Sequence, residues 1–338
     1  MQNLQQLENL YFTWKGNLPD RIEALRNTSA SSRLYFRIYD NKQTVIGVFN
    51  ADIKENRAFF HFSQIFGQTS INVPKIYGVS SSETYYLIQD LGDTNLLDIL
   101  KQEGESDRVK QLYKLSIDQL FRMQFAATDQ IDFETFAYPR SAFDKQAVLW
   151  DLYYFKYYFL KVSGLSFDEQ LLEYDFQFLA ESMAQQEWTA FMFRDFQARN
   201  IQIVDQKPWL IDYQGGRKGP VLYDLVSLLY QASAQLTPPY REELKLYYKN
   251  LLSQKVTVQD DMFEKAMNSL ALIRIVQTLG AYGYRGLIEK KKYFIDSIPM
   301  ALSNLENLLK NQAFKSEIPY FIEILSDLSQ LKIKFVNK

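Results

Sequence analysis

The chain of 338 residues contains no cysteine and a single histidine, His61. The absence of cysteine excludes disulfides, thiolate metal sites and cysteine nucleophiles. His61 lies in the pattern Glu55, Phe59, Phe62, Phe66, which predicts an amphipathic helix and a packing or surface role for the imidazole. No G-x-S-x-G elbow accompanies it, so we expect catalysis to rest on carboxylates, Arg, Lys, Tyr or a bound metal.

A strong net charge and long apolar runs are missing as well. The formal net charge of −2 indicates no basic surface for nucleic acid. No run approaches the roughly 18 to 20 apolar residues that span a bilayer. The polar start MQNLQQLENL also lacks the charged and apolar regions of a signal peptide. We therefore expect a cytoplasmic protein that binds neither nucleic acid nor membrane, and the sequence leaves its oligomeric state open.

The first 92 residues combine strand and helix signals, and the turn-like Asp40-Asn41-Lys42 separates two β-rich runs. The predicted elements are a hairpin (34–39 and 44–49), a helix (52–66) and two further strands (74–79 and 84–88). This pattern indicates a small α+β lobe.

Helical periodicity dominates after Asp90-Leu91-Gly92, with one β-rich interruption at 189–210. The predicted helices cover 105–127, 143–161 and 167–185, and helices resume from Val221. No low-complexity linker separates the two regions. We predict an α+β fold of two lobes, a β-rich N-lobe at 1–92 and a larger, mainly helical C-lobe at 93–338, which meet at a hinge.

The β-rich interruption contains FRDFQARNIQIV, from Phe193 to Val204, followed by WLIDYQGG. In protein kinases a loop aspartate orients the nucleophile, while an asparagine five positions later and an aspartate on a following strand end hold Mg²⁺. Asp195, Asn200 and Asp212 have that order and spacing. A hairpin of 201–204 and 208–211 brings Asn200 and Asp212 to the same end. The alternative is an ordinary hairpin whose aspartates are turn residues.

These segments resemble the aminoglycoside phosphotransferase and choline kinase-like superfamily, whose catalytic loop reads H-x-D-x-x-x-x-N. Gln214, Gly219-Pro220 and the stretch Tyr223–Ser227 resemble the bacterial branch that includes anomeric N-acetylmuramate and N-acetylglucosamine kinases. The resemblance implies a protein-kinase-like fold, ATP and Mg²⁺ as cofactors, and transfer of a phosphoryl group to a small-molecule acceptor. It also implies that Asp224 is a buried acid that ties the catalytic loop to the next helix.

The sequence departs from the family pattern at the nucleotide side and at Phe193, where the family has histidine. The loop at 27–33 has no glycine, although its small residues still permit close approach to phosphate. The strand TVIGVFN has no lysine, so Arg33 or Arg37, with Glu55 as a partner, would supply that charge. The expected nucleotide contacts are Ser29, Ser31, Ser32, Arg33, Arg37, Glu55 and Gln89. A polar turn and an exposed charged strand remain the alternatives.

The segment from Arg194 to Lys218 is basic apart from the two site carboxylates and Asp205. A cationic acceptor side disfavours polycationic aminoglycosides and favours a neutral or anionic acceptor such as a sugar acid. We expect Arg199, Gln214 and Arg217 near the acceptor, although a structural salt bridge is an alternative for Arg217. Three functions stay open, namely a sugar kinase, a kinase of an aminoglycoside, choline or other small alcohol, and a nucleotide-binding pseudokinase.

Overall fold

The structure is a computed structural model that describes residues 2–25, 33–41, 43–310 and 316–331. Its N-terminal part is a five-stranded antiparallel sheet in the order β1-β2-β3-β5-β4. The strands are β1 (Arg21–Ala24), β2 (Leu34–Asp40), β3 (Gln43–Phe49), β4 (Ile76–Val79) and β5 (Tyr85–Gln89). The hairpin and the two later strands expected from the sequence are confirmed, whereas β1 was not predicted.

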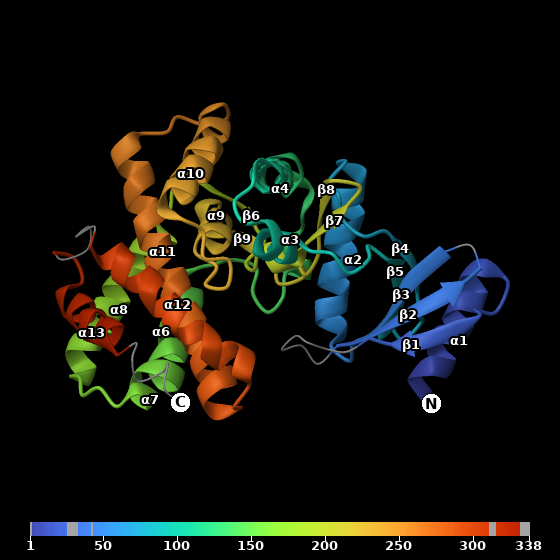
Figure 1. Ribbon diagram of the computed structural model, residues 1–338, viewed down its shortest axis with the longest axis horizontal. Coiled ribbons are helices and arrows are strands. Elements are labelled where there is room, and N and C mark those ends of the chain that lie inside the picture. Colours follow the sequence, from blue (N-terminus) through green and yellow to red (C-terminus); the bar gives the residue numbers. More distant parts are fainter. Residues whose placement is uncertain (1, 26–32, 42, 311–315, 332–338) are drawn as a thin grey trace.

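Two helices cover the two faces of this sheet (Figure 1). Helix α1 (Gln2–Lys15) packs Leu7 and Tyr11 on one face, and Gly47 of β3 leaves room for the Leu7 side chain. Helix α2 (Ile53–Gln68) packs Phe59 on the other face, against Tyr86 of β5. Burial of both faces explains the near-continuous apolar run of β3. Helix α2 was predicted, and α1 was not.

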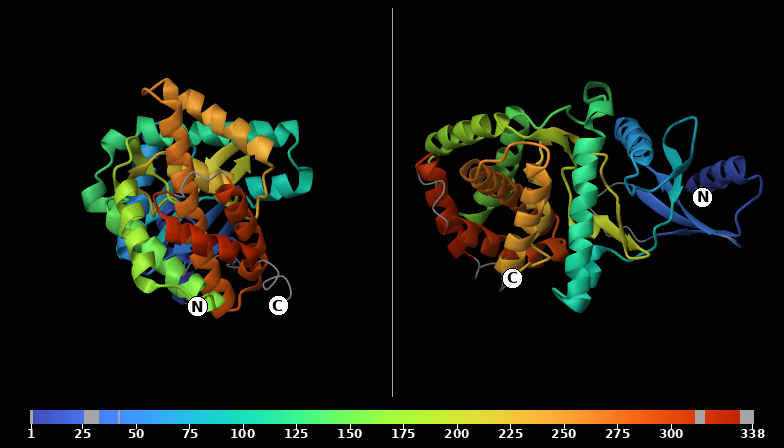
Figure 2. Two further views of the ribbon diagram at one scale, coloured as in Figure 1. Left: turned by 90° about the vertical axis from the view of Figure 1, so that its left-hand side faces the viewer. Right: turned by 90° about the horizontal axis from the view of Figure 1, so that it is seen from above.

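The rest of the chain is mainly helical and lies at the other end of the long axis (Figures 1 and 2). Its α-helices are α3 (Leu96–Glu103), α4 (Asp107–Ala126), α5 (Phe133–Phe136), α6 (Lys145–Phe155), α7 (Lys161–Ser163), α8 (Glu169–Ala184), α9 (Leu222–Leu229), α10 (Pro238–Ser253), α11 (Asp260–Tyr282), α12 (Lys292–Leu309) and α13 (Pro319–Gln330). Two π-helical turns, η2 (Lys156–Leu160) and η4 (Gly283–Ile288), extend α6 and α11. The structure therefore has the mixed, two-part architecture that the sequence predicted.

Two short antiparallel pairs carry the β-rich interruption. The pair β6 (Thr189–Met192) and β9 (Arg217–Pro220) was not predicted as a pair, because RKGP has weak strand propensity. The pair β7 (Ile201–Val204) and β8 (Lys207–Leu210) is the predicted hairpin with a shorter turn than expected. Asp205 and Gln206 both have positive φ, which gives a two-residue turn and leaves Lys207 in the strand.

Within the described residues, no helix is both long enough and apolar enough to cross a membrane.

Candidate active site

Buried hydrogen bonds fix the loop that begins at Phe193. Asp224 in the first turn of α9 is fully buried, and its carboxylate accepts from the backbone N–H groups of Phe193 (2.7 Å) and Arg194 (2.9 Å). This confirms the expected tie between the loop and the helix. The Arg194 side chain donates to both oxygens of Asp151 on α6, at 2.6 and 2.8 Å, and its backbone has a φ of +81°. The loop conformation is thus held from two helices.

Asp195 follows directly and lies between two guanidinium groups. Its Oδ2 accepts from Arg199 at 2.9 Å, and its Oδ1 accepts from Arg274 at 2.6 Å. Asn200 donates to the carbonyl oxygen of Asp195 at 2.9 Å and to Oδ2 at 3.3 Å. Burial opposes ionisation, but the two guanidinium groups outweigh it and lower the pKa of Asp195 to about 2. The carboxylate is therefore charged at neutral pH and can accept a hydrogen bond from a hydroxyl group.

Asn200 and Asp212 lie at the same end of the β7–β8 hairpin, as predicted. The N–H of Ile211 donates to the carbonyl of Asn200 at 3.0 Å, which joins the two strand ends. Asp212 adopts a φ of +72°, and its Oδ1 accepts from Gln214 at 2.7 Å and from Arg33 at 3.3 Å. Within the described part of the chain, no hydrogen bond occupies its Oδ2. One amide and one carboxylate oxygen form a donor set that suits Mg²⁺ completed by water and phosphate oxygens.

The N-terminal part contributes Arg33, which is 5% exposed. Its guanidinium bonds Glu55 of α2 at 2.6 Å and Asp212 at 3.3 Å, so one cation joins the helix to the strand end that carries Asp212. Glu55 also accepts from Asn50 at 2.8 Å. Arg37 has other partners, because it bonds Asp90 and Asp93 at 2.8 Å each, next to the predicted hinge. Of the two arginines, Arg33 is therefore the one beside Asp212.

The other predicted residues lie in several places. Ser29, Ser31 and Ser32 fall outside the described residues. Gln89 ends β5, where its side-chain oxygen accepts from the N–H of Lys75 at 3.4 Å.

Two residues that we predicted near the acceptor have side-chain hydrogen bonds within the segment 212–217. Gln214 supports Asp212 through the bond described above. Arg217 is 7% exposed and donates to the carbonyl of Gly215 at 3.0 and 3.1 Å. Within the described residues no carboxylate forms an ion pair with Arg217, so the structure does not contain the salt bridge that was its alternative role.

Sequence reasoning missed Arg274, which reaches Asp195 from the middle of α11. It also missed the Asp151–Arg194 pair, although the two residues lie in the predicted helix 143–161 and in the motif FRDFQARN. The only signal in the sequence was a charged residue within the apolar run SLALIRIVQTLG, which indicates a buried cation with a partner. Nothing in the sequence identified that partner.

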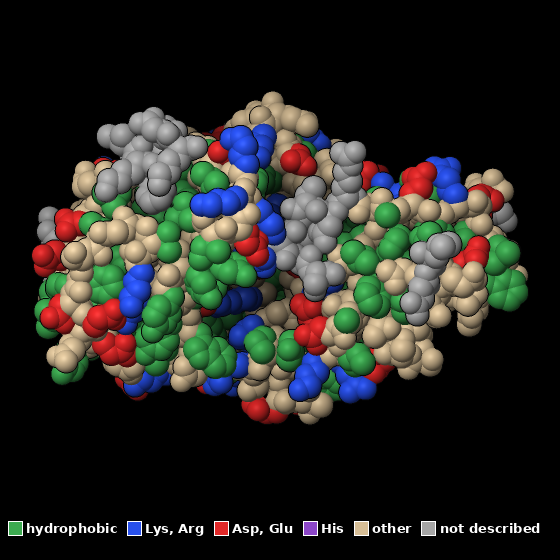
Figure 3. Space-filling model, turned by 90° about the horizontal axis from the view of Figure 1, so that it is seen from below, with side chains coloured by type: hydrophobic (Ala, Val, Ile, Leu, Met, Phe, Trp, Pro, Cys, Tyr) green, Lys and Arg blue, Asp and Glu red, His purple; other side chains and the backbone are tan. Residues whose placement is uncertain are grey.

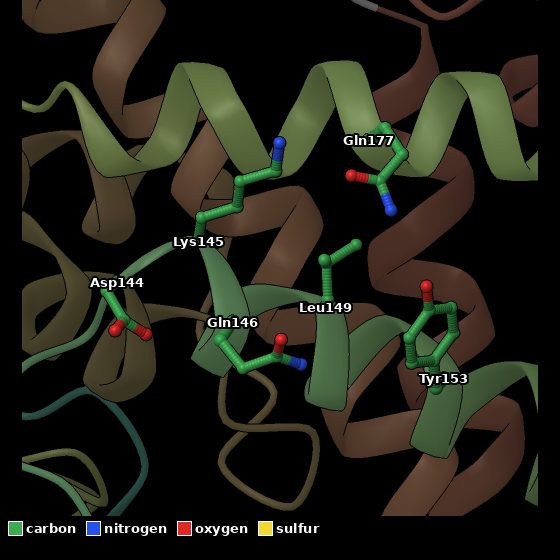
Figure 4. Close-up of a pocket in the computed structure, with 6 residues that line it drawn as sticks. All are labelled: Asp144, Lys145, Gln146, Leu149, Tyr153 and Gln177. Atoms are coloured by element: carbon green, nitrogen blue, oxygen red, sulfur yellow. The ribbon is translucent and has the colours of Figure 1, made fainter.

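The molecular surface is hollowed between the two parts, and Lys and Arg side chains gather in this hollow (Figure 3). A separate cavity of about 560 Å³ lies between α6 and α8 (Figure 4). Its lining includes Lys145, Leu149 and Tyr153, which recur at helical spacing on one side of α6, whereas Asp151 lies on the other side. The Lys145 and Tyr153 side chains bind carboxylates of α8. This cavity is therefore apart from Asp195.

The sequence from residue 23 to residue 256 matches the model of the phosphotransferase enzyme family, APH. The chain belongs to this family. It is 22% identical over 323 residues to the N-acetylmuramate/N-acetylglucosamine kinase of Pseudomonas aeruginosa, covering 93% of this chain and 91% of that protein. It is 24% identical over 250 residues to the N-acetylmuramate/N-acetylglucosamine kinase of Neisseria meningitidis serogroup B, covering 72% of each. The family resemblance stated from the motifs is confirmed.

The fold agrees with this membership of the phosphotransferase family. The solved structure of the amicoumacin kinase hAmiN, in complex with AMP-PNP, Ca²⁺ and Ami, superposes with a TM-score of 0.65 at 12% identity. The superposition covers 93% of this chain and 94% of that one. The prediction of a kinase-like fold is confirmed, and the chain is an enzyme of the class that phosphorylates small-molecule hydroxyl groups.

Proposed function

We propose that this phosphotransferase uses ATP and Mg²⁺ to phosphorylate a hydroxyl group of an N-acetylated amino sugar or its sugar acid. The observation that carries the proposal is the position of an ionised Asp195 beside the Asn200–Asp212 pair. A proton acceptor adjacent to a pair of Mg²⁺ ligands is the arrangement that phosphoryl transfer requires. We place this reaction in the cytoplasm, with ATP as the phosphoryl donor and a small molecule as the acceptor.

In the proposed reaction the acceptor oxygen forms a bond to the γ-phosphorus as the bond from that phosphorus to the bridging oxygen of ADP breaks. The acceptor hydroxyl proton passes to Asp195, and ADP leaves. Asn200 and Asp212 would hold Mg²⁺, which when bound neutralises charge on the phosphate oxygens. Asp195 also orients the attacking oxygen, because its own position is fixed by Asn200 and two arginines.

On the nucleotide side, we assign to Arg33 the charge that a lysine supplies in protein kinases. Its bonds to Glu55 and Asp212 support this choice, since they bring a cation to the strand end that would carry the metal and phosphates. Arg37 is less suited, because it bonds Asp90 and Asp93 beside the hinge, whereas Arg33 bonds Asp212. The serines at 29, 31 and 32 and Gln89 remain predicted nucleotide contacts.

On the acceptor side, Arg199 and Arg217 favour a neutral or anionic ligand over a polycation. N-acetylation removes the positive charge of an amino sugar, and a carboxylate adds a negative one, so both groups suit these arginines. The curated relatives are named as kinases of N-acetylmuramate and N-acetylglucosamine. Both sugars are N-acetylated, and N-acetylmuramate also carries a carboxylate. Arg217, buried without a carboxylate partner among the described residues, is the residue we assign to an acceptor oxygen or carboxylate.

A coupled ADP-release assay tests the acceptor class directly. The panel is N-acetylmuramate, N-acetylglucosamine, unacetylated glucosamine, kanamycin and choline, each with MgATP and with Asp195→Asn as the inactive control. We expect turnover with the two N-acetylated sugars and much less with the three amines or ammonium compounds. Preferred turnover of kanamycin or choline would overturn the proposed substrate class.

Isothermal titration with ATP tests the metal assignment separately. We expect ATP affinity to require Mg²⁺ and to fall about tenfold or more in Asp212→Ala, corresponding to at least about 1.4 kcal/mol. Asp195→Ala should bind MgATP nearly as well as wild type, because Asp195 faces the acceptor. Equal nucleotide affinity for wild type and Asp212→Ala would show that Asp212 is not a metal ligand.

A further inference from the structure

Arg274 lies in the middle of α11, far in sequence from the catalytic loop, yet it makes a 2.6 Å ion pair with Oδ1 of Asp195. Its second terminal nitrogen donates to Gln277 on the same helix at 2.8 Å. Its guanidinium also lies 5.8 Å from the ring centre of Tyr223, which is fully buried. The orientation of this guanidinium is therefore fixed by three partners, namely Asp195 of the catalytic loop, Gln277 of α11 and Tyr223 of α9.

The two arginines that contact Asp195 differ in their freedom to move. The Arg274 side chain is 7% exposed, whereas the Arg199 side chain is 38% exposed and lies on the same short loop as Asp195. Breaking one bond of a buried guanidinium leaves a buried donor without a partner, which costs free energy. A partly exposed guanidinium can exchange its partner for water or a ligand at little cost. Oδ1 is thus held firmly. Oδ2 accepts a 3.3 Å bond from Asn200 and a 2.9 Å bond from Arg199, and the contact with Arg199 is the one that a ligand can replace.

The helix that carries Arg274 is itself closely packed against α6. A Cβ added at Gly280 would lie 2.9 Å from the backbone nitrogen of Phe155, and one added at Gly283 would lie 2.0 Å from the carbonyl oxygen of Tyr158. Helix α6 also carries Asp151, which binds Arg194, the residue before Asp195. The α6–α11 pair therefore holds both the loop backbone and the Asp195 carboxylate.

We infer that Arg274 is a positioning residue that immobilises Oδ1 of Asp195 and so makes Oδ2 the oxygen that accepts the proton from the attacking hydroxyl. This inference rests on the proposed function. When the acceptor binds, its hydroxyl takes the place of Arg199 at Oδ2, and the bond to Arg274 remains. The proton then moves from the hydroxyl oxygen to Oδ2 while the new oxygen–phosphorus bond forms.

The test compares Arg274→Ala, Arg274→Lys and wild type in two assays, MgATP titration and steady-state ATP turnover. Misplacement of a catalytic group by about 1 Å can reduce turnover about a hundredfold. We expect kcat of Arg274→Ala to fall by about that factor, with ATP affinity and sugar KM within about threefold of wild type. Arg274→Lys should recover part of kcat, because a single ammonium can bond one carboxylate oxygen but cannot also reach Gln277.

Chemical rescue separates positioning from a merely structural role. Millimolar guanidinium added to Arg274→Ala should raise kcat several-fold, because the free cation can bind beside Oδ1, and should leave wild type unchanged. Arg241→Ala is the matched control, since Arg241 is a partly buried arginine that bonds Asn304 on α12 and lies over the Tyr230 ring, and it forms no ion pair with Asp195 in the described part of the chain. This variant can lose thermal stability but should keep kcat and show no rescue.

A kcat of Arg274→Ala equal to that of wild type would overturn the inference. It would also be overturned if guanidinium did not restore the lost kcat and ATP affinity fell by the same factor. In the proposed mechanism, water can replace the sugar hydroxyl, so ATP hydrolysis would need Asp195 but no sugar. If wild type hydrolyses MgATP and phosphorylates no N-acetylated sugar, the proposed substrate is wrong, and the Arg274 comparison on hydrolysis still decides the inference. If wild type turns over no ATP under any condition, both proposals fail.

Discussion

The C-terminal and N-terminal parts contribute to the site in different ways. In the C-terminal part, four polar residues of the site lie within one short stretch, where Asp195, Asn200, Asp212 and Asp224 follow one another at set spacings. Each is fixed by buried or partly buried hydrogen bonds to neighbouring backbone or side chains. Such a loop requires particular residues at particular positions, because every donor or acceptor that loses its partner in a buried site costs free energy.

The N-terminal part supplies a charge rather than a loop. Arg33 precedes β2, Glu55 lies on α2, and no lysine is present in β3, yet the cation still reaches Asp212. A positive charge has to reach the correct point in space, and a long side chain can do so from different backbone positions. The loop can therefore be recognised in the sequence by its spacing, whereas the source of the charge can be recognised only from the fold.

In the C-terminal part of the site, we expect Asp195→Asn to cause the largest loss of turnover. The amide keeps the shape but accepts no proton at neutral pH, and loss of such assistance typically reduces turnover about a hundred- to ten-thousand-fold. MgATP affinity should stay nearly unchanged, because the metal and phosphate contacts lie elsewhere. The measurement is ADP release beside nucleotide titration on the same two proteins. Unchanged turnover would mean that another residue carries the reaction.

The corresponding change in the N-terminal part is Arg33→Ala, with Arg37→Ala as its matched control. Charge-assisted hydrogen bonds contribute about 1.5 to 3 kcal/mol, so Arg33→Ala should raise KM for ATP by about ten- to a hundredfold. Arg37→Ala breaks bonds to Asp90 and Asp93 and should change KM for ATP by less than about threefold. Steady-state kinetics with varied ATP make the comparison. The reverse order of effects would assign the phosphate charge to Arg37.

The pH dependence of the free energy of unfolding tests the burial of Asp224, which holds the catalytic loop. Burial raises the pKa of Asp224 from its ordinary 3.8 to about 7, although the N–H groups of Phe193 and Arg194 lower it. Because this pKa is higher in the folded state, the favourable contribution is complete below about pH 4 and is lost as pH rises through 7. The folded protein should therefore lose about 2 to 3 kcal/mol from this group between pH 5 and pH 8.

Urea unfolding of wild type and Asp224→Asn at pH 5 and pH 8 isolates that effect, since His61 titrates in both proteins and cancels. Asparagine does not ionise, so its variant should lose less stability over the same range. The variant should be less stable than wild type at pH 5, because its amide N–H₂ faces a backbone donor. Parallel pH curves for the two proteins would place the Asp224 titration outside this range.

The sequence predicted those parts of the fold that depend on local signals. Alternation of apolar residues identified the hairpin of β2 and β3, and the order of Asp195, Asn200 and Asp212 identified the catalytic loop. Strand β9 escaped prediction because its pairing is imposed by β6 and not by the residues RKGP. Helix α1 escaped because its apolar face becomes evident only when the sheet covers it.

The parts of the site that sequence could not provide all involve partners far apart in the chain. Arg274 meets Asp195 only because α11 packs against α6 and α9, and Arg194 meets Asp151 for the same reason. Charge alone made Arg33 and Arg37 equivalent candidates, and only the distances separate them. Long-range ion pairs carry no spacing rule, so the fold is needed to find them.

The smallest expected effect is at Phe193, where the family pattern has histidine. Phe193 is 1% exposed and packs edge-on against Phe196 (5.5 Å between ring centres) and Tyr213 (6.2 Å), so apolar contacts already hold the start of the loop. Its backbone N–H is bound by Asp224 whatever the side chain. Restoring histidine adds at most one supporting hydrogen bond of about 1 kcal/mol, and each 1.4 kcal/mol is a factor of ten in rate.

Phe193→His should therefore change turnover by no more than about tenfold in either direction, with Phe193→Leu as a control that keeps the site apolar. Both variants should bind MgATP as wild type does, because neither touches Asp212 or Arg33. The assay is ADP release with a responsive acceptor, corrected for the folded fraction by thermal unfolding. If Phe193→His converts an inert protein into an active kinase, the native chain is a pseudokinase, and the buried bonds of the C-terminal loop then serve nucleotide binding without turnover.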